Sequence, residues 1–333
     1  MHSRIGGKLL TPLITGERVF LRDVIGLYMV ELGKRDSRVV IVNADLMGTC
    51  RNRSFADRFP ERSFNVGIAE QCLVSFAAGL AHEGFIPYVF SMAPFLSMRA
   101  CEQVRTDVAY GNLNVRLIGV YAGCSGGISG VTHWGMEDCA IMGSMPNMTV
   151  MEPCDAEQAR QMLDASLTHQ GPIYLRCSVE PVCNVYKENF TYRLGHADLL
   201  RSGEDGAFLC SGITVRYALD AAERIHARSG KEIRVVDLHD FKPIDREAVV
   251  DAARTGVVVT AQDHSVNGGL GAAVGQIIAE EGMSVHYAVR GIPDRFMIMA
   301  HAPYIYHQIG LDTDGLEKAM TDLLLETERD SCG

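Results

Sequence analysis

Short runs of aliphatic and β-branched residues alternate with longer helical patterns along the first half of the chain. The apolar runs cover residues 39–42, 85–90, 115–120, 148–151 and 173–176, and helical patterns lie between them at 69–83, 99–110 and 156–169. Strands of a parallel sheet that is covered by helices on both faces show this pattern. We therefore predict a doubly wound α/β domain of five strands over residues 18–180.

The periodicity is lost between residues 178 and 193 and then begins again. We interpret 181–193 as a linker. In the second half, strand patterns cover 207–211, 233–237, 257–261 and 285–289, and helical patterns cover 215–229, 245–254, 271–281 and 315–325. This alternation predicts a second, smaller doubly wound α/β domain over 194–326, with tails at 1–17 and 327–333.

Composition narrows the class of protein. The 333 residues are 47% hydrophobic and 22% charged, which is typical of a folded protein of two domains. The net charge is −10 and the basic residues are scattered, so we expect no nucleic-acid partner. Ten cysteines form no CxxC pair, and neither a signal-peptide core nor a run of about 18 apolar residues is present. We expect a cytoplasmic protein that is neither exported nor membrane-bound.

Three glycine-containing segments are candidate catalytic or ligand-binding sites. NVGIAEQ places Glu70 in the first turn of a helix, although the helix dipole alone would favour a carboxylate there. GCSGGISGVTH follows the strand ending at Val120, where α/β sheets bind ligands, so we assign His133 a functional role. GGLGAAVG is an incomplete dinucleotide fingerprint because Val274 replaces its last glycine, and the histidines show no zinc-site spacing.

The order of several motifs resembles a known family. GIAEQ, the segment around Phe95, THWGMEDCAIMGSMPNMTVMEPCD and GPIYLR closely resemble the pyrimidine-binding domain of transketolases. VVDLHDFKPID, AQDHSVNGGLG and GIPDRF in the second half resemble the transketolase C-terminal domain. The resemblance extends from about Arg18 to Leu325. It implies a thiamine-diphosphate pyrimidine-binding fold followed by a transketolase C-terminal-like domain.

The resemblance also implies roles for individual residues. Glu70 matches the glutamate that hydrogen-bonds the aminopyrimidine ring of thiamine diphosphate, and Phe95 matches the aromatic residue that stacks on this ring. Met92 in the pocket wall and Asp45 are further candidates for cofactor contact. His133 matches the substrate-loop histidine, so Glu70 and His133 are the expected catalytic residues.

The sequence departs from the family pattern where a phosphorylated substrate would be recognised. Tyr121 replaces a histidine, Ser129 an aspartate, and Val179 and Gly143 each replace an arginine. The loss of these polar groups removes contacts for a phosphorylated polyol. We therefore expect thiamine chemistry with altered substrate recognition.

The GDG motif of the family's diphosphate-binding domain is absent from the chain. The resemblance is therefore to the C-terminal subunit of a split transketolase, whose N-terminal partner would supply the Mg²⁺ and diphosphate ligands in an α2β2 assembly. The expected reaction is transfer of a two-carbon ketol unit from a small ketose donor. Two alternatives remain: transfer to a non-sugar or lipoyl acceptor on a carrier protein, and a non-catalytic regulatory subunit.

Overall fold

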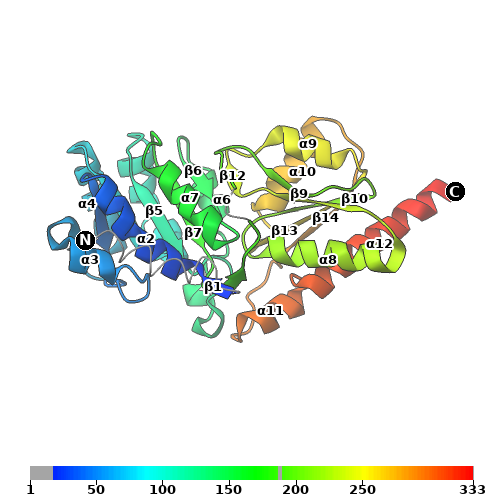
Figure 1. The fold of residues 1–333 in the computed structure, drawn as a ribbon, viewed down its shortest axis with the longest axis horizontal. Coiled ribbons are helices and arrows are strands. Elements are labelled where there is room, and N and C mark those ends of the chain that lie inside the picture. Colours follow the sequence, from blue (N-terminus) through cyan, green and yellow to red (C-terminus); the bar gives the residue numbers. More distant parts are fainter. Residues whose placement is uncertain (1–17, 187–189, 333) are drawn as a thin grey trace.

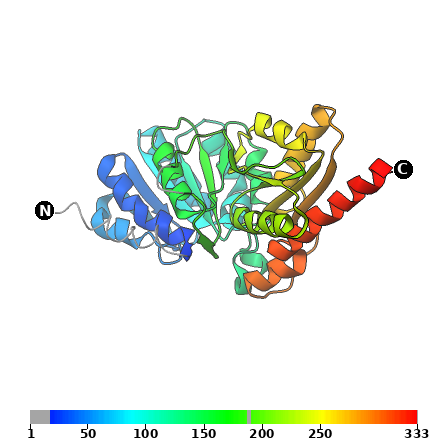
Figure 2. The same ribbon diagram turned by 45° about the vertical axis from the view of Figure 1, so that its right-hand side comes forward.

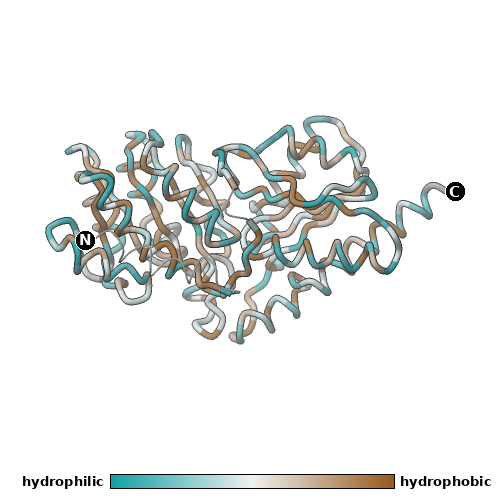
Figure 3. Tube along the Cα trace, viewed as in Figure 1, coloured by the Kyte–Doolittle hydropathy of each residue, from teal (hydrophilic) through white to brown (hydrophobic). Residues whose placement is uncertain are grey.

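A computed structural model describes residues 18–186 and 190–332 as two α/β domains that lie side by side (Figure 1). The predicted tail 1–17 lies outside the described residues. Apolar segments are concentrated in the strands and on the inner faces of the helices (Figure 3). No helix in the described part of the chain has the length and apolar character needed to cross a membrane.

The N-terminal sheet has seven strands in the order β12-β6-β7-β5-β4-β2-β3. All its strands are parallel except β12. Their bounds are β2 (Val39–Asn43), β3 (Ser63–Asn65), β4 (Ile86–Met92), β5 (Arg116–Val120), β6 (Thr149–Met151), β7 (Ile173–Cys177) and β12 (Asp240–Lys242). The central strands β2, β4, β5 and β7 are buried along their whole length, as the continuous apolar runs predict.

Helices cover both faces of this sheet. The apolar side chains of one face pack with α2 and α7, and those of the other face pack with α4, α6 and two π-helical segments, η2 and η3. The bounds are α2 (Leu21–Arg35), α3 (Arg53–Arg58), α4 (Glu70–His82), η2 (Phe95–Arg99), α5 (Cys101–Gln103), η3 (Val104–Ala109), α6 (Asp138–Gly143) and α7 (Ala156–Ser166). The helix predicted over 99–110 is thus divided into π-helical and α-helical turns.

The prediction of five strands in this domain was wrong in number. Two of the three residues of strand β3, Ser63 and Asn65, are polar, so β3 forms no apolar run. Strand β12 comes from the second half of the chain and joins the edge of the N-terminal sheet antiparallel to β6. Such long-range pairing has no local sequence signal.

The C-terminal domain is a five-stranded sheet in the order β14-β13-β10-β11-β9. Helices α9 and α10 cover one face, and α8, α11 and α12 pack on the other (Figure 2). The bounds are β9 (Asp198–Arg201), β10 (Gly206–Cys210), α8 (Thr214–Ser229), β11 (Ile233–Asp237), α9 (Arg246–Ala253), β13 (Val257–Ser265), α10 (Leu270–Glu280), β14 (His286–Ile292), α11 (Ala302–Ile309) and α12 (Thr313–Cys332). The doubly wound prediction for this half is confirmed.

Two predicted irregular segments contain regular structure. The segment 181–193 begins with strand β8 (Pro181–Cys183), which pairs antiparallel with β1 (Arg18–Phe20) and so belongs with the N-terminal domain. The predicted tail 327–333 is helical as far as Cys332, because α12 continues beyond its packed part (Figure 1). The polar composition of its last turns carries no core-facing signal.

Candidate active site

Glu70 begins α4 at the carboxyl end of the N-terminal sheet. Gly67, with φ of +77°, makes the turn between β3 and the helix. The Glu70 side chain is only 1% exposed, and both carboxylate oxygens face donors: Arg99 Nη1 donates to Oε2 at 2.7 Å, and Ser91 Oγ donates to Oε1 at a long 3.4 Å. The predicted position of Glu70 at a helix start is confirmed, and one of its oxygens remains weakly satisfied.

Phe95 and His133 lie in contact with each other, and Arg99 links Phe95 to the Glu70 carboxylate. The two rings meet edge to face with their centroids 5.6 Å apart. The Arg99 guanidinium lies over the Phe95 ring, 4.1 Å from its centroid, while it holds Glu70. Three residues predicted from separate motifs are therefore linked in one cluster, and Arg99 joins them. Arg99 was missed, although its place one helical turn after Phe95 is a signal for a shared face.

The loop after β5 carries Tyr121, Ser129 and His133. Tyr121 leaves the strand in the left-handed region, at φ of +65°, and two short 3-10 turns contain Ser129 and His133. Thr132 Oγ1 lies 2.8 Å from His133 Nδ1. This hydrogen bond engages Nδ1 and leaves Nε2 as the nitrogen that can meet a ligand.

The C-terminal domain holds this loop through Asp263 on β13. Asp263 Oδ1 accepts the Cys124 backbone N–H at 2.9 Å, and Oδ2 accepts the Tyr306 hydroxyl at 2.7 Å. A Cβ on Gly123, whose φ is +60°, would lie 2.1 Å from the Asp263 side chain, so only glycine allows this approach. The loop is therefore fixed by a residue from the other domain.

Comparison with known proteins identifies the family. Residues 17–183 match the transketolase pyrimidine-binding domain, and residues 195–316 match the transketolase C-terminal domain. The chain belongs to the transketolase family.

Several relatives that match over almost their whole length are named as subunits of split transketolases. The 6-deoxy-6-sulfo-D-fructose transketolase subunit SqwH of Clostridium sp. (strain MSTE9) is 38% identical over 94% of this chain and 96% of its own length. An apulose-4-phosphate transketolase subunit of Phocaeicola vulgatus is 35% identical over 89% of this chain and 95% of its own. The solved structure described as "Split gene transketolase, inactive beta4 tetramer" has a TM-score of 0.82 and 36% identity, and the match covers 92% of this chain and 98% of that one.

Two further candidate residues lie on the same edge of the transketolase pyrimidine fold. Asp45 follows β2, is exposed, and exchanges hydrogen bonds with Asn65: its N–H donates to Asn65 Oδ1 at 3.0 Å, and Asn65 Nδ2 donates to its carboxylate at 3.4 Å. Met92 ends β4 and is buried in the hydrophobic core. Their roles in cofactor contact stay predictions.

At two positions where we predict a departure from the family pattern, the structure shows how the space is used. Val179 is buried, and its N–H donates to Ser125 Oγ of the loop at 3.2 Å. A Cβ on Gly143 would lie 2.4 Å from the Phe241 ring, so an aromatic side chain from β12 fills the space beside this position. Lys242 Nζ donates to the Gly143 carbonyl at 2.9 Å. An arginine at position 143 would displace this contact between the domains.

Arg176 is not available to bind a substrate anion, because it is fully buried and its hydrogen bonds are made within the protein. It donates to both oxygens of Asp138 at 3.0 Å and to Glu152 Oε1 at 2.6 Å. It also donates to the Asp263 carbonyl at 2.9 Å, which connects the two domains. Arg176 is therefore a structural cation between the domains.

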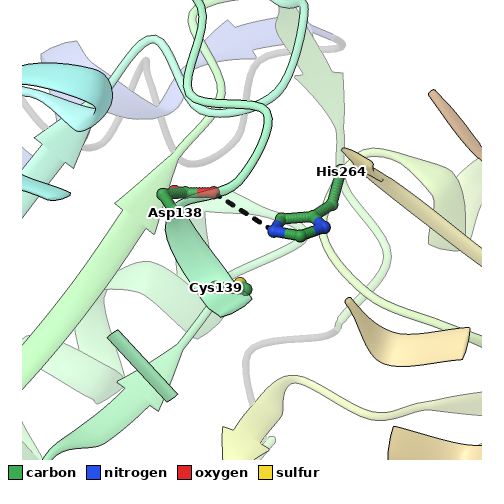
Figure 4. Close-up of side chains that lie close together, drawn as sticks. All are labelled: Asp138, Cys139 and His264. Atoms are coloured by element: carbon green, nitrogen blue, oxygen red, sulfur yellow. Dashed lines mark ion pairs between the residues drawn. The ribbon is translucent and has the colours of Figure 1, made fainter. Parts of the chain in front are cut away.

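Beside Arg176, Asp138 and Cys139 lie close to His264 (Figure 4), with His264 Nε2 3.9 Å from Asp138 Oδ1. These residue types bind transition metals, but here they are engaged otherwise. Asp138 already accepts Arg176 and the Tyr174 hydroxyl, and burial raises the pKa of the Cys139 thiol. A divalent cation would lie next to a guanidinium, so the cluster is better explained as a hydrogen-bonded network.

Proposed function

We propose that this chain is the β-type subunit of a two-component transketolase that uses thiamine diphosphate and Mg²⁺ and transfers a two-carbon ketol unit from a ketose donor. The observation that carries the proposal is the cluster at the carboxyl edge of the sheet in which Arg99 connects Glu70 to Phe95, and Phe95 contacts His133. A buried carboxylate beside an aromatic ring fits an aminopyrimidine, which offers a ring nitrogen and a flat face.

The proposed roles follow from the contacts. Glu70 Oε1, which has only a long hydrogen bond from Ser91, would bind the pyrimidine nitrogen and hold a proton there. Phe95 would support the ring, with Met92 in the wall and Asp45 at the rim. His133 Nε2 would bind the substrate, in a loop that also contains Tyr121 and Ser129. When bound, thiamine diphosphate supplies the nucleophile and electron sink for two-carbon transfer.

A partner subunit would complete the site. The sequence contains no GDG motif. Among the described residues, two clusters have metal-ligand spacing. In the first, Asp138 is already bound to Arg176, and the second lies at the surface around Asp312. We therefore assign the diphosphate and Mg²⁺ ligands to an N-terminal-type transketolase subunit, in an α2β2 complex. The nine cysteines from Cys50 to Cys210 are free thiols, which fits the cytoplasmic location that we propose.

Calorimetry with thiamine diphosphate and Mg²⁺ tests this proposal. The isolated chain should bind the cofactor weakly, because it offers only the pyrimidine contacts, whereas the reconstituted complex should bind it tightly and transfer ketol units. Tight Mg²⁺-dependent binding to the chain alone would contradict the division of the site. A complex that binds no cofactor through this chain would instead indicate a regulatory subunit.

A second candidate function is transfer to a lipoyl group on a carrier protein. It is favoured by an exposed apolar segment after β14, in which Phe296, Ile298 and Met299 are at least 66% exposed. Met299 also lies beside Gly130 of the substrate loop. Assays of the complex with lipoylated carrier and with sugar acceptors distinguish the two functions, since a carrier-dependent enzyme would leave free aldoses unconverted.

Recognition of the acceptor's anionic group is expected to be weak in this chain. The names of two relatives specify a sulfo sugar and a phosphorylated sugar, but here Val179 is buried and Arg176 is held internally. One charge-assisted hydrogen bond contributes about 1.5–3 kcal/mol. We predict that kcat/KM for ribose 5-phosphate exceeds that for ribose by less than about tenfold. A preference above about a hundredfold would mean that another cation binds the phosphate.

A further inference from the structure

Arg99 stands out because it contacts two predicted cofactor-binding residues and matches no motif used to identify the site. Its guanidinium donates to Glu70 Oε2 at 2.7 Å and lies 4.1 Å from the centre of the Phe95 ring. The segment η2 places Phe95 and Arg99 at its two ends. One side chain thus bridges the carboxylate and the aromatic ring.

The two ends of this ion pair have different environments. The Glu70 side chain is 1% exposed, whereas that of Arg99 is 44% exposed. An ion pair between two exposed groups contributes little, but a buried carboxylate without a partner is costly. Arg99 therefore compensates a charge that the fold has already removed from water, while its own loss of hydration is small.

The geometry also distinguishes the two oxygens of Glu70. Arg99 takes Oε2, and Oε1 keeps only the 3.4 Å contact with Ser91 Oγ. A carboxylate that is anchored through one oxygen cannot rotate freely, so the other oxygen is presented in a fixed direction. The planar guanidinium, held against Phe95, restrains the aromatic ring in the same way.

We infer that Arg99 is a positioning residue for the reaction: it anchors Glu70 through Oε2, so that Oε1 is fixed for the ring nitrogen of the cofactor, and it braces Phe95 behind the same ring. The inference rests on the proposed function, because it assigns the weakly satisfied oxygen to the pyrimidine of thiamine diphosphate. Arg99 acts through Glu70 and Phe95 and needs no contact with substrate.

A double-mutant cycle in the isolated chain tests the pairing without cofactor. Arg99→Met should lower the melting temperature by about 4 °C, because it leaves the buried Glu70 carboxylate without its main partner. In a Glu70→Gln background the same substitution should have almost no effect. Arg105→Met, which changes an exposed arginine that follows η2, is the matched control and should leave stability unchanged.

Cofactor affinity in the reconstituted complex tests the positioning. By calorimetry, Arg99→Met should weaken thiamine diphosphate binding about tenfold, and it should lower kcat without raising KM for the ketose donor. Arg99→Lys keeps the charge but loses the flat guanidinium, so it should restore stability and only part of the affinity.

The two proposals fail in different ways. If the wild-type complex binds no thiamine diphosphate, the proposed function is wrong. If the wild-type complex binds it and Arg99→Met binds equally tightly, or if Arg99→Met destabilises the Glu70→Gln chain as much as the wild type, the positioning role is wrong.

Discussion

Arg176 and Arg99 each pair with a buried carboxylate, and their surroundings differ. Arg176 is fully buried, donates to Asp138 and Glu152, and reaches a backbone carbonyl of the C-terminal domain. Arg99 donates to the single carboxylate Glu70, and almost half of its own side chain is exposed. The first is enclosed between two domains, and the second lies at the open edge of one sheet.

This difference shows which of the two ion pairs can bind a ligand. The carboxylates around Arg176 accept further hydrogen bonds from the protein. Glu152 also accepts from Ser211 and Gln262, and Asp138 also accepts from Tyr174. A fully satisfied network makes the domain contact rigid and offers nothing to a ligand. At Glu70 one oxygen has only a long hydrogen bond and the neighbouring arginine is accessible, so the same pair of residue types can accept a ligand.

The largest expected effect is the loss of activity on changing Glu70 in the Arg99–Glu70 pair. Glu70→Gln should lower kcat of the reconstituted complex about 10²–10⁴-fold, because an amide cannot exchange a proton with the pyrimidine nitrogen. Stability should change little, since Arg99 can turn to solvent. Steady-state kinetics and thermal unfolding measure the two effects. Glu83→Gln, at the exposed end of the same helix, is the control, and equal kinetics for both variants would show that Glu70 only starts a helix.

Changing Arg176, which lies enclosed between the domains, should mainly reduce stability. Arg176→Met should lower the free energy of unfolding by about 3–5 kcal/mol, because two buried carboxylates lose their cation. Urea unfolding measures this change. Arg254→Met, whose side chain is 70% exposed, should alter stability by less than about 0.5 kcal/mol. Similar values for both variants would mean that the network does not hold the domains.

A smaller effect is expected from the aspartate that links the enclosed network to the substrate loop. Burial raises the pKa of Asp263 to about 6, above the value of about 3.9 for an unfolded chain. The folded state therefore binds the proton more tightly, and the resulting stabilisation is present below about pH 4 and lost as the pH rises through about 6.

The titration of Asp263 alone should lower the free energy of unfolding by about 1 kcal/mol between pH 5 and pH 7. Asp263→Asn should remove that part of the pH dependence in urea unfolding, whereas Asp322→Asn, with a side chain that is 49% exposed, should not. An unchanged pH profile in Asp263→Asn would show that Asp263 is not protonated in this range.

Much of the fold could be predicted from sequence because the signals are local. Buried parallel strands read as continuous apolar runs, and β2, β4, β5 and β7 lie within a few residues of their predicted places. β12 was missed because its partner β6 is about 90 residues away, and β3 because two of its three residues are polar. A strand that is recognised only through pairing leaves no pattern of its own.

The sequence by itself determined which chemical groups the site contains: the carboxylate of Glu70, the ring of Phe95 and the imidazole of His133 stand in motifs that resemble one family. Only the tertiary structure decided how these groups are held. Arg99 reaches Glu70 across 29 residues, and Asp263 reaches the substrate loop across 139 residues. Hydrogen bonds and ion pairs act over a few ångströms in space, so a partner distant in sequence is known only once the chain has folded.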